Sequence, residues 1–300
     1  MKRVSANISP TLLGIVELCR PVNSLMGVFA IFVGIAVASS RAPLFLPLDQ
    51  TVFHLVGGLL LAFSIMALND VIDYEIDRIN APWRPIPSGR VSREFAWLLG
   101  AFSATAGLAV SFLIEPAPRV AALALVVLIL SHSYNIYFKR VPLVGNVIVA
   151  WITALPLVYG GLITSHYLGL ESVNWTRLSL IWVMAFATVL GREVVKSVAD
   201  VEGDRARGAY TIAVLLGARR AVYLALLFYL VALVAGIAIA LVGSVRLAIY
   251  LPLLAVISAI ALWDSVKLLK NPEPGVALAH KNRLLYLMLL ALVAVYVSSV

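Results

Sequence analysis

Four acidic residues follow a long apolar stretch in the segment "NDVIDYEIDR", which starts at Asn69. Asn69, Asp73 and Asp77 are spaced i, i+4, i+8, so a helix places them in one stripe. Stacked carboxylates repel one another, and a divalent cation turns that repulsion into coordination. Oxygen-only ligands favour Mg²⁺, which leaves positions open for water and phosphate oxygens. We expect this stripe to bind metal, with Asp70 and Glu75 pointing off it as supporting polar groups.

A second acidic motif, "DVEGD", begins at Asp200 and places Asp204 one helical turn later. Alone it resembles many acidic loops, just as the first motif alone could be a solvated helix end. Two acidic helix ends on the same side of a membrane can face each other across a cavity. That arrangement suits two Mg²⁺ ions binding one diphosphate.

Basic residues accompany both motifs, and a metal-bound phosphate ester would use them as charge-assisted donors. Contact with anionic lipid is the alternative for each of them. Arg192 and Lys196 are the stronger candidates, because they precede Asp200 by two turns and one turn within an apolar helix. The segment "NAPWRPIPSGR" (80–90) predicts a stiff, non-helical loop that caps a cavity. The residues of this basic group are Arg78, Arg84, Arg90, Lys139, Arg140, Arg192, Lys196 and Arg205.

Other kinds of site have no support in the sequence. The single cysteine, Cys19, allows no intrachain disulfide, and there is no cysteine–histidine zinc spacing. No glycine-rich phosphate loop is present, and the four histidines are scattered. The net charge of +8 could suggest nucleic acid, but 62% of the residues are hydrophobic and 13% charged. Basic loops that face anionic lipid explain the charge better, so we expect no nucleic-acid partner.

The elements that position these motifs are predicted to be membrane spans, each of which needs roughly 20 mostly apolar residues. A short helix over about 10–18 should lie at the interface and lead into the first span. The nine predicted spans cover about 22–40, 51–69, 94–114, 119–138, 144–165, 177–199, 219–242, 246–266 and 283–299.

Loop charges predict the orientation of these spans. With the N-terminus inside, 19 of the 23 lysine and arginine residues fall on the inner side. We therefore expect a multi-pass cell-membrane protein whose N-terminus and active-site loops are cytoplasmic. A secondary transporter is the competing class, but it predicts charges near mid-span, whereas these acids cluster at the inner ends.

At this point the chain resembles the UbiA superfamily of intramembrane prenyltransferases over nearly its whole length. Two segments show this resemblance, "NDVIDYEIDRINAPWRPIPSGRVS" (69–92) and "DVEGDRARGAYTIAVLLG" (200–217). The resemblance implies an all-α membrane protein of nine transmembrane helices around a central cavity, with a cytoplasmic polar cap. It also implies one prenyltransferase domain over 1–300 and transfer of a prenyl group from a prenyl diphosphate.

Within the superfamily, "CRPVNSLMGVFAIFVG" (19–34) and "GREVVKSVADVEGDRARGA" (191–209) look most like the archaeal digeranylgeranylglyceryl phosphate synthases. Such enzymes transfer a geranylgeranyl group to the sn-2 hydroxyl of geranylgeranylglyceryl phosphate in ether-lipid synthesis. An acceptor that carries a phosphate fits the many basic residues. Prenylation of an aromatic acceptor such as 4-hydroxybenzoate or a naphthoate, as in quinone synthesis, is the alternative.

The resemblance also implies roles for individual residues. Asn69, Asp73 and Asp77 would hold one Mg²⁺, and Asp200 and Asp204 the second. Arg20 and Asn23 are candidate acceptor contacts. The predicted diphosphate-binding residues are Arg78, Arg84, Lys139, Arg140, Arg192 and Lys196, and Tyr134 with Lys139 matches a Tyr…Lys element near the leaving diphosphate.

The implied chemistry is ionisation of the prenyl diphosphate to an allylic cation, which the acceptor hydroxyl attacks. Exclusion of water by the spans would keep this cation from hydrolysis. Asp77 or the diphosphate itself could take the proton of the hydroxyl. Membrane lipids would surround the C20 tail of the substrate.

Overall fold

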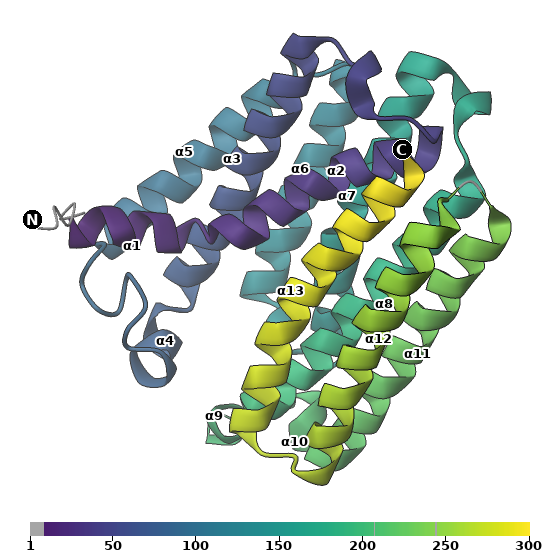
Figure 1. The fold of residues 1–300 in the computed structure, drawn as a ribbon. Helices are drawn as coiled ribbons and strands as arrows, with labels where there is room; N and C mark the ends of the chain where they lie inside the picture. Colours follow the sequence, from purple (N-terminus) through teal and green to yellow (C-terminus); the bar gives the residue numbers. More distant parts are fainter. Residues whose placement is uncertain (1–8, 207, 244) are drawn as a thin grey trace, which may run out of the picture. The chain divides into compact units, whose positions relative to one another are not determined.

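The computed structural model describes residues 9–206, 208–243 and 245–300. These residues form helices and loops without a strand, and nine of their helical segments are long and apolar enough to cross a membrane. The predicted all-α fold class with nine spans is confirmed. The spans are α1 with α2 (Pro10–Leu18, Pro21–Ser39), α3 (Leu48–Ile72), α5 (Arg93–Ser111), α6 (Ala117–Ile136), α7 (Val144–Leu168), α8 (Trp175–Ala199), α11 (Ala218–Val242), α12 (Leu247–Lys270) and α13 (Pro274–Ser299), as Figure 1 shows.

Short helices connect several spans. They are α4 (Tyr74–Asn80), α9 (Val201–Ala206), α10 (Ile212–Leu216) and the 3₁₀ turns Pro43–Phe45, Phe138–Arg140 and Leu170–Ser172. Eight predicted spans begin within a few residues of the observed helices, and the short helix before the first span is confirmed as α1. The ninth prediction was wrong at its start, because α13 begins at Pro274 rather than 283. Proline is favourable in the first helical turn, and Arg283 is paired with Asp264 of α12, so its charge does not end the helix.

The chain divides into two compact units, which are described separately. The first comprises Met1–Gly27 and Asp49–Ile136, and the second comprises Val28–Leu48 and Tyr137–Val300. The first acidic motif belongs to the first unit and the second motif to the second unit. The single domain over 1–300 stays a prediction, as does the cavity between the two motifs.

In the first unit, α3 and α5 approach closely and the loop after α4 packs against α1. Gly100 and Gly107 of α5 lie against Leu68 and Leu61 of α3, where an added Cβ would collide with the leucine side chains. One apolar core joins α1, α3, α5 and the loop at residues 81–92, so the loop is fixed close to the end of α3. The buried residues of this core are Leu18, Ala67, Val71, Ile86, Val91 and Ala96.

In the second unit, α8 is the central helix and packs against α7, α11 and α13, while α12 packs against α11 and α13. Figure 1 shows α8, α11, α12 and α13 as a set of long helices in this unit. The second half of α2 crosses α7 so closely that a Cβ on Gly34 or Gly160 would collide with the backbone of the other helix. At the end of α8, Ser197 Oγ accepts a hydrogen bond from the Ala213 amide of α10 at 3.3 Å. These contacts fix the end of α8 that carries the second motif.

Candidate active site

The first acidic motif spans the junction between α3 and α4. The regular helix is interrupted at Asp73, which is the residue before the first turn of α4. Two backbone hydrogen bonds continue across the interruption, from the Asp73 amide to the Asn69 carbonyl at 2.9 Å and from the Asp77 amide to the Asp73 carbonyl at 2.8 Å. Because these bonds preserve helical spacing, Asn69, Asp73 and Asp77 lie in one row despite the change of helix.

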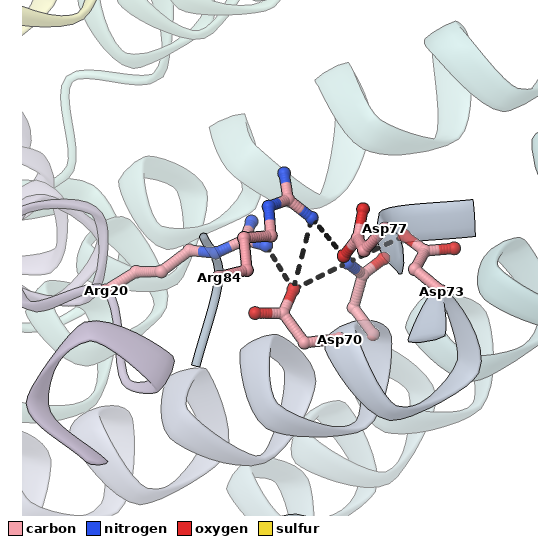
Figure 2. A network of polar contacts seen from close by, with 6 residues as sticks. Arg20, Asp70, Asp73, Asp77 and Arg84 are labelled. Atoms are coloured by element: carbon pink, nitrogen blue, oxygen red, sulfur yellow. Dashed lines mark hydrogen bonds and ion pairs between the residues drawn. The ribbon is translucent and has the colours of Figure 1, made fainter. Parts of the chain in front are cut away.

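The side chains of this motif form a polar network with two arginines (Figure 2). Asn69 Nδ2 donates to Asp73 Oδ2 at 3.2 Å and to Asp70 Oδ1 at 3.3 Å. Arg84 Nη1 donates to Asp77 Oδ2 at 2.5 Å and lies 3.8 Å from Asp70 Oδ1. All three aspartates are buried, with 5% of each residue exposed.

Asp70 has a larger role than its position in the sequence suggested. It was expected off the metal-binding stripe, yet its Oδ1 atom receives contacts from Asn69, Arg84 and Arg20. The expectation for Glu75 was right, because its side chain is exposed and pairs with Arg78 at 3.4 Å near solvent. Arg78, a predicted phosphate ligand, therefore lies outside the network in this structure.

Arg20 lies between α1 and α2 in an unusual backbone conformation. Its φ of 43° is in the left-handed region, which residues other than glycine rarely adopt. The guanidinium Nη2 pairs with Asp70 Oδ1. Strained residues that persist commonly serve a site, and here the turn directs a cation to a buried carboxylate. Asn23, the other predicted acceptor contact, lies partly buried in the first turn of α2.

The loop at residues 81–92 is non-helical, as predicted, and Arg90 fastens it to α1. Arg90 Nη1 and Nη2 donate to the two carboxylate oxygens of Glu17 at 2.9 and 2.7 Å. Nη2 also donates to the Trp83 carbonyl at 2.7 Å, within the same loop. These hydrogen bonds fix the loop at Trp83. The next residue, Arg84, is thereby held where its side chain reaches Asp77.

The electrostatics of the network favour a bound cation. Burial raises the pKa of the Asp77 carboxyl above its usual value; Arg84 opposes this shift, and the charges of Asp73 and Asp70 add to it. Three buried carboxylates face two guanidinium groups, so negative charge is in excess. Among the described residues, no three carboxylate, imidazole or thiol groups converge into a ready-made metal cage. The oxygen donors and surplus charge nevertheless fit a hard divalent cation that keeps part of its own hydration.

The second acidic motif lies in the second unit, where α8 ends and α9 begins. Asp200 caps the end of α8, and the Asp204 amide donates to the Asp200 carbonyl at 2.9 Å, one turn later. Asp200 is exposed and Asp204 is partly buried. The two carboxylates therefore lie one turn apart at a helix end, and the chain turns at Gly208, where φ is 66°.

Glu193 was missed by the sequence reasoning. It is 6% exposed within α8, and its carboxylate lies 3.4 Å from Arg192 Nη1 and 3.5 Å from Lys196 Nζ. A signal was present, because an acidic residue inside an apolar span is costly unless it serves neighbouring charges. Its position between the two expected phosphate ligands indicates that it holds them.

The remaining predicted residues lie where the sequence passes from the first unit to the second, at residues 136 and 137. Tyr134 is near the end of α6 in the first unit, and Lys139 lies in the 3₁₀ turn that begins the second. The side chain of Arg140 falls outside the part of the chain that is described. The positions of these residues relative to the acidic motifs stay a prediction.

Comparison with known proteins identifies the family. The model of the UbiA prenyltransferase family matches residues 27–291. The chain belongs to this family. The prediction of a UbiA-type prenyltransferase from the two acidic motifs is confirmed. With nine apolar helices of spanning length in the part that the structure describes, the chain is a multi-pass membrane protein.

Relatives within the UbiA family carry a more specific name. A digeranylgeranylglyceryl phosphate synthase of Natronomonas pharaonis is 35% identical over 268 residues, 88% of this chain and 90% of the relative. That of Methanothermobacter thermautotrophicus is 30% identical over 263 residues, 87% of each chain.

Solved UbiA structures have the same fold. One described as a digeranylgeranylglyceryl phosphate synthase in membranes has a TM-score of 0.72 and 22% identity, and the match covers 96% of this chain and 98% of the other. A UbiA homologue from Archaeoglobus fulgidus, bound to DMAPP and Mg²⁺, has a TM-score of 0.66 and 19% identity over 94% and 99% of the chains.

Proposed function

We propose that this prenyltransferase transfers a geranylgeranyl group from geranylgeranyl diphosphate to the sn-2 hydroxyl of geranylgeranylglyceryl phosphate, a step of ether-lipid synthesis. The observation that carries the proposal is the identity of 30% and 35%, over nearly nine-tenths of the chain, to proteins named digeranylgeranylglyceryl phosphate synthase. Both substrates carry phosphate, which fits the basic side chains on α8 and beside the first motif.

The acidic motifs supply ligands for divalent metal. Mg²⁺ bound to UbiA homologues of the same fold supports this assignment. Asn69, Asp73 and Asp77 would hold one ion, and Asp200 and Asp204 a second. When bound, Mg²⁺ neutralises the charge that develops on a diphosphate leaving group.

The arginines of the first motif have two tasks in this proposal. Without substrate, Arg84 and Arg20 neutralise Asp77 and Asp70, which keeps three buried carboxylates stable. With substrate, Arg84 donates its N–H groups to diphosphate oxygens, since a guanidinium binds phosphate through paired hydrogen bonds. Asp70 keeps Arg20 in place for the head group of the acceptor.

The remaining steps use charge and exclusion of water. Arg192 and Lys196 donate to the departing diphosphate, the allylic C1–O bond breaks, and the acceptor oxygen bonds to C1. The hydroxyl proton passes to a carboxylate such as Asp77 or to the released diphosphate. The apolar helices enclose the C20 tail away from bulk water, so the allylic cation reacts with the acceptor rather than with water. Membrane lipids surround these helices, and the active-site loops lie on the cytoplasmic side.

A panel of acceptors tests the proposal. Purified protein with Mg²⁺ and geranylgeranyl diphosphate is offered geranylgeranylglyceryl phosphate, 4-hydroxybenzoate and a naphthoate in separate reactions. We expect digeranylgeranylglyceryl phosphate in the first reaction and no prenylated aromatic acid. Turnover of an aromatic acid with none of the lipid phosphate would reject the assigned acceptor and favour quinone-type prenylation. Metal-dependent ion uptake into liposomes without any prenyl product would instead indicate a transporter.

A further inference from the structure

Three cationic side chains on two helices of the second unit interact with one buried carboxylate, Glu193. Arg192 and Lys196 lie one turn apart on α8, and Glu193 lies between them. Arg192 Nε donates to the backbone carbonyl of Lys281 at 3.3 Å, so α13 lies directly against α8 at this level. The Lys281 ammonium interacts electrostatically with Glu193, Asp200 and the two α8 cations.

The contacts between Glu193 and its two α8 cations are long for charged groups. Glu193 lies 3.4 and 3.5 Å from its two cations, whereas close charge-assisted pairs span about 2.7–2.9 Å. By contrast, Arg283 Nη1 of α13 and Asp264 Oδ1 of α12 are 2.5 Å apart, so short ion pairs do form in this unit. Within the described residues, the Lys281 ammonium has no hydrogen bond or ion pair.

A buried hydroxyl beside the cluster also lacks a partner. The Tyr229 hydroxyl on α11 is inaccessible to solvent and has no hydrogen bond within the described part of the chain. The Tyr229 ring packs against Gly191, and its hydroxyl interacts electrostatically with Arg192 and Glu193. A buried donor left unpaired is costly, so a bound anion would stabilise both the hydroxyl and the cations.

We propose that Lys281, Arg192 and Lys196 form a phosphate-binding site and that Glu193 is a positioning residue for the two α8 cations. Three positive charges face the negative charges of Glu193 and Asp200, so the cluster stays net positive and attracts a phosphate anion. This site rests on the proposed function in one respect, because its ligand is the diphosphate of the donor or the phosphate of the acceptor. Lys281 is the new binding residue, and it joins α13 to a site that the sequence placed on α8.

Equilibrium binding to full-length protein in detergent tests the site without relying on turnover. The probes are a non-reactive thio analogue of geranylgeranyl diphosphate and geranylgeranylglyceryl phosphate, with geranylgeraniol and geranylgeranylglycerol as phosphate-free controls. We expect K281M to raise the Kd of at least one phosphate ligand about 10- to 100-fold. The Kd values of the phosphate-free ligands should not change, and K281R should restore much of the affinity.

Lys267 provides the matched control, because its ammonium lies over the Trp263 ring at 5.2 Å and belongs to no phosphate cluster. K267M should bind every probe as wild type does. If K281M affects only the donor analogue, the site holds the diphosphate; if it affects only the acceptor, the site holds the phosphomonoester. Unchanged Kd values for both phosphate ligands in folded K281M, or no binding of either by wild type, overturns the site. K281Q is the second variant if K281M does not fold.

Glu193→Gln tests whether Glu193 positions Arg192 and Lys196 or only contributes its negative charge. Removing a negative charge makes the cluster more positive, so electrostatics alone predicts tighter phosphate binding. A positioning role predicts weaker phosphate binding with unchanged binding of the phosphate-free ligands, and tighter binding would overturn that role. Product formation is measured separately. If wild type binds the phosphate ligands but forms no product, the proposed function is wrong and the site stands. If K281M binds them as wild type does, the site is wrong and the proposed function stands.

Discussion

Asp70→Asn is the substitution whose effect follows most directly from the network of the first motif. Asp70 Oδ1 pairs with Arg20, lies 3.8 Å from Arg84, and accepts from Asn69 at 3.3 Å. Removing one partner of a fully buried ion pair costs about 3–5 kcal/mol. Here the Arg20 and Arg84 side chains are 32% and 37% exposed, so water screens the charge that remains. We therefore expect D70N to lower the free energy of unfolding by about 1–2 kcal/mol.

The functional effect of D70N should fall mainly on the acceptor. Arg20 loses the carboxylate that compensates its left-handed backbone, so its guanidinium is no longer fixed. With Arg20 as an acceptor contact, we expect KM for geranylgeranylglyceryl phosphate to rise about tenfold, the equivalent of 1.4 kcal/mol. The assays are denaturant unfolding in detergent micelles and steady-state kinetics with each substrate varied.

Glu75→Gln is the matched control for this experiment. Glu75 is on the same segment, but its side chain is 68% exposed and its pair with Arg78 is open to solvent. E75Q should change stability by no more than about 0.5 kcal/mol and leave both KM values unchanged. If D70N is as stable and as active as E75Q, the central place given to Asp70 is wrong.

Three further outcomes are expected. D73A and D200A should abolish turnover while the proteins stay folded in detergent, since removal of clustered like charges relieves repulsion; full activity in both would reject the two-metal site. E17Q should release Arg90 and speed amide hydrogen exchange in the loop at residues 81–92, measured by mass spectrometry, and an unchanged exchange rate would show that the loop is held by other contacts. G160A should destabilise the protein by about 1–3 kcal/mol in denaturant unfolding, because its Cβ would meet the α2 backbone; wild-type stability would show that the crossing can relax.

Much of the fold was predictable because it depends on the length and polarity of single segments. A span must be apolar over about 20 residues, and this requirement located all nine spans, with only the start of α13 misplaced. The prolines at 82, 85 and 87 predicted the non-helical loop for a similarly local reason. The start of α13 was not predictable in this way, since the pairing of Arg283 with Asp264 on another helix makes its polar residues acceptable there.

The candidate site was predictable where it follows helical periodicity. The row of Asn69, Asp73 and Asp77 follows from their spacing, and backbone hydrogen bonds preserve it through the break at Asp73. The role of Asp70 depends on Arg20, which is 50 residues away in the sequence and reaches it from a strained turn. Such a contact depends on the tertiary structure, and no local sequence pattern predicts it.

The identity of the product tests the central claim most directly. Purified protein is incubated with Mg²⁺, geranylgeranyl diphosphate and an extract of the native lipids, and the products are identified by mass spectrometry. We predict one dominant product, a glycerol phosphate lipid that has gained a single geranylgeranyl group at its free hydroxyl. A prenylated aromatic compound as the dominant product, or no prenylated product from an extract that contains the lipid phosphate, would contradict the account.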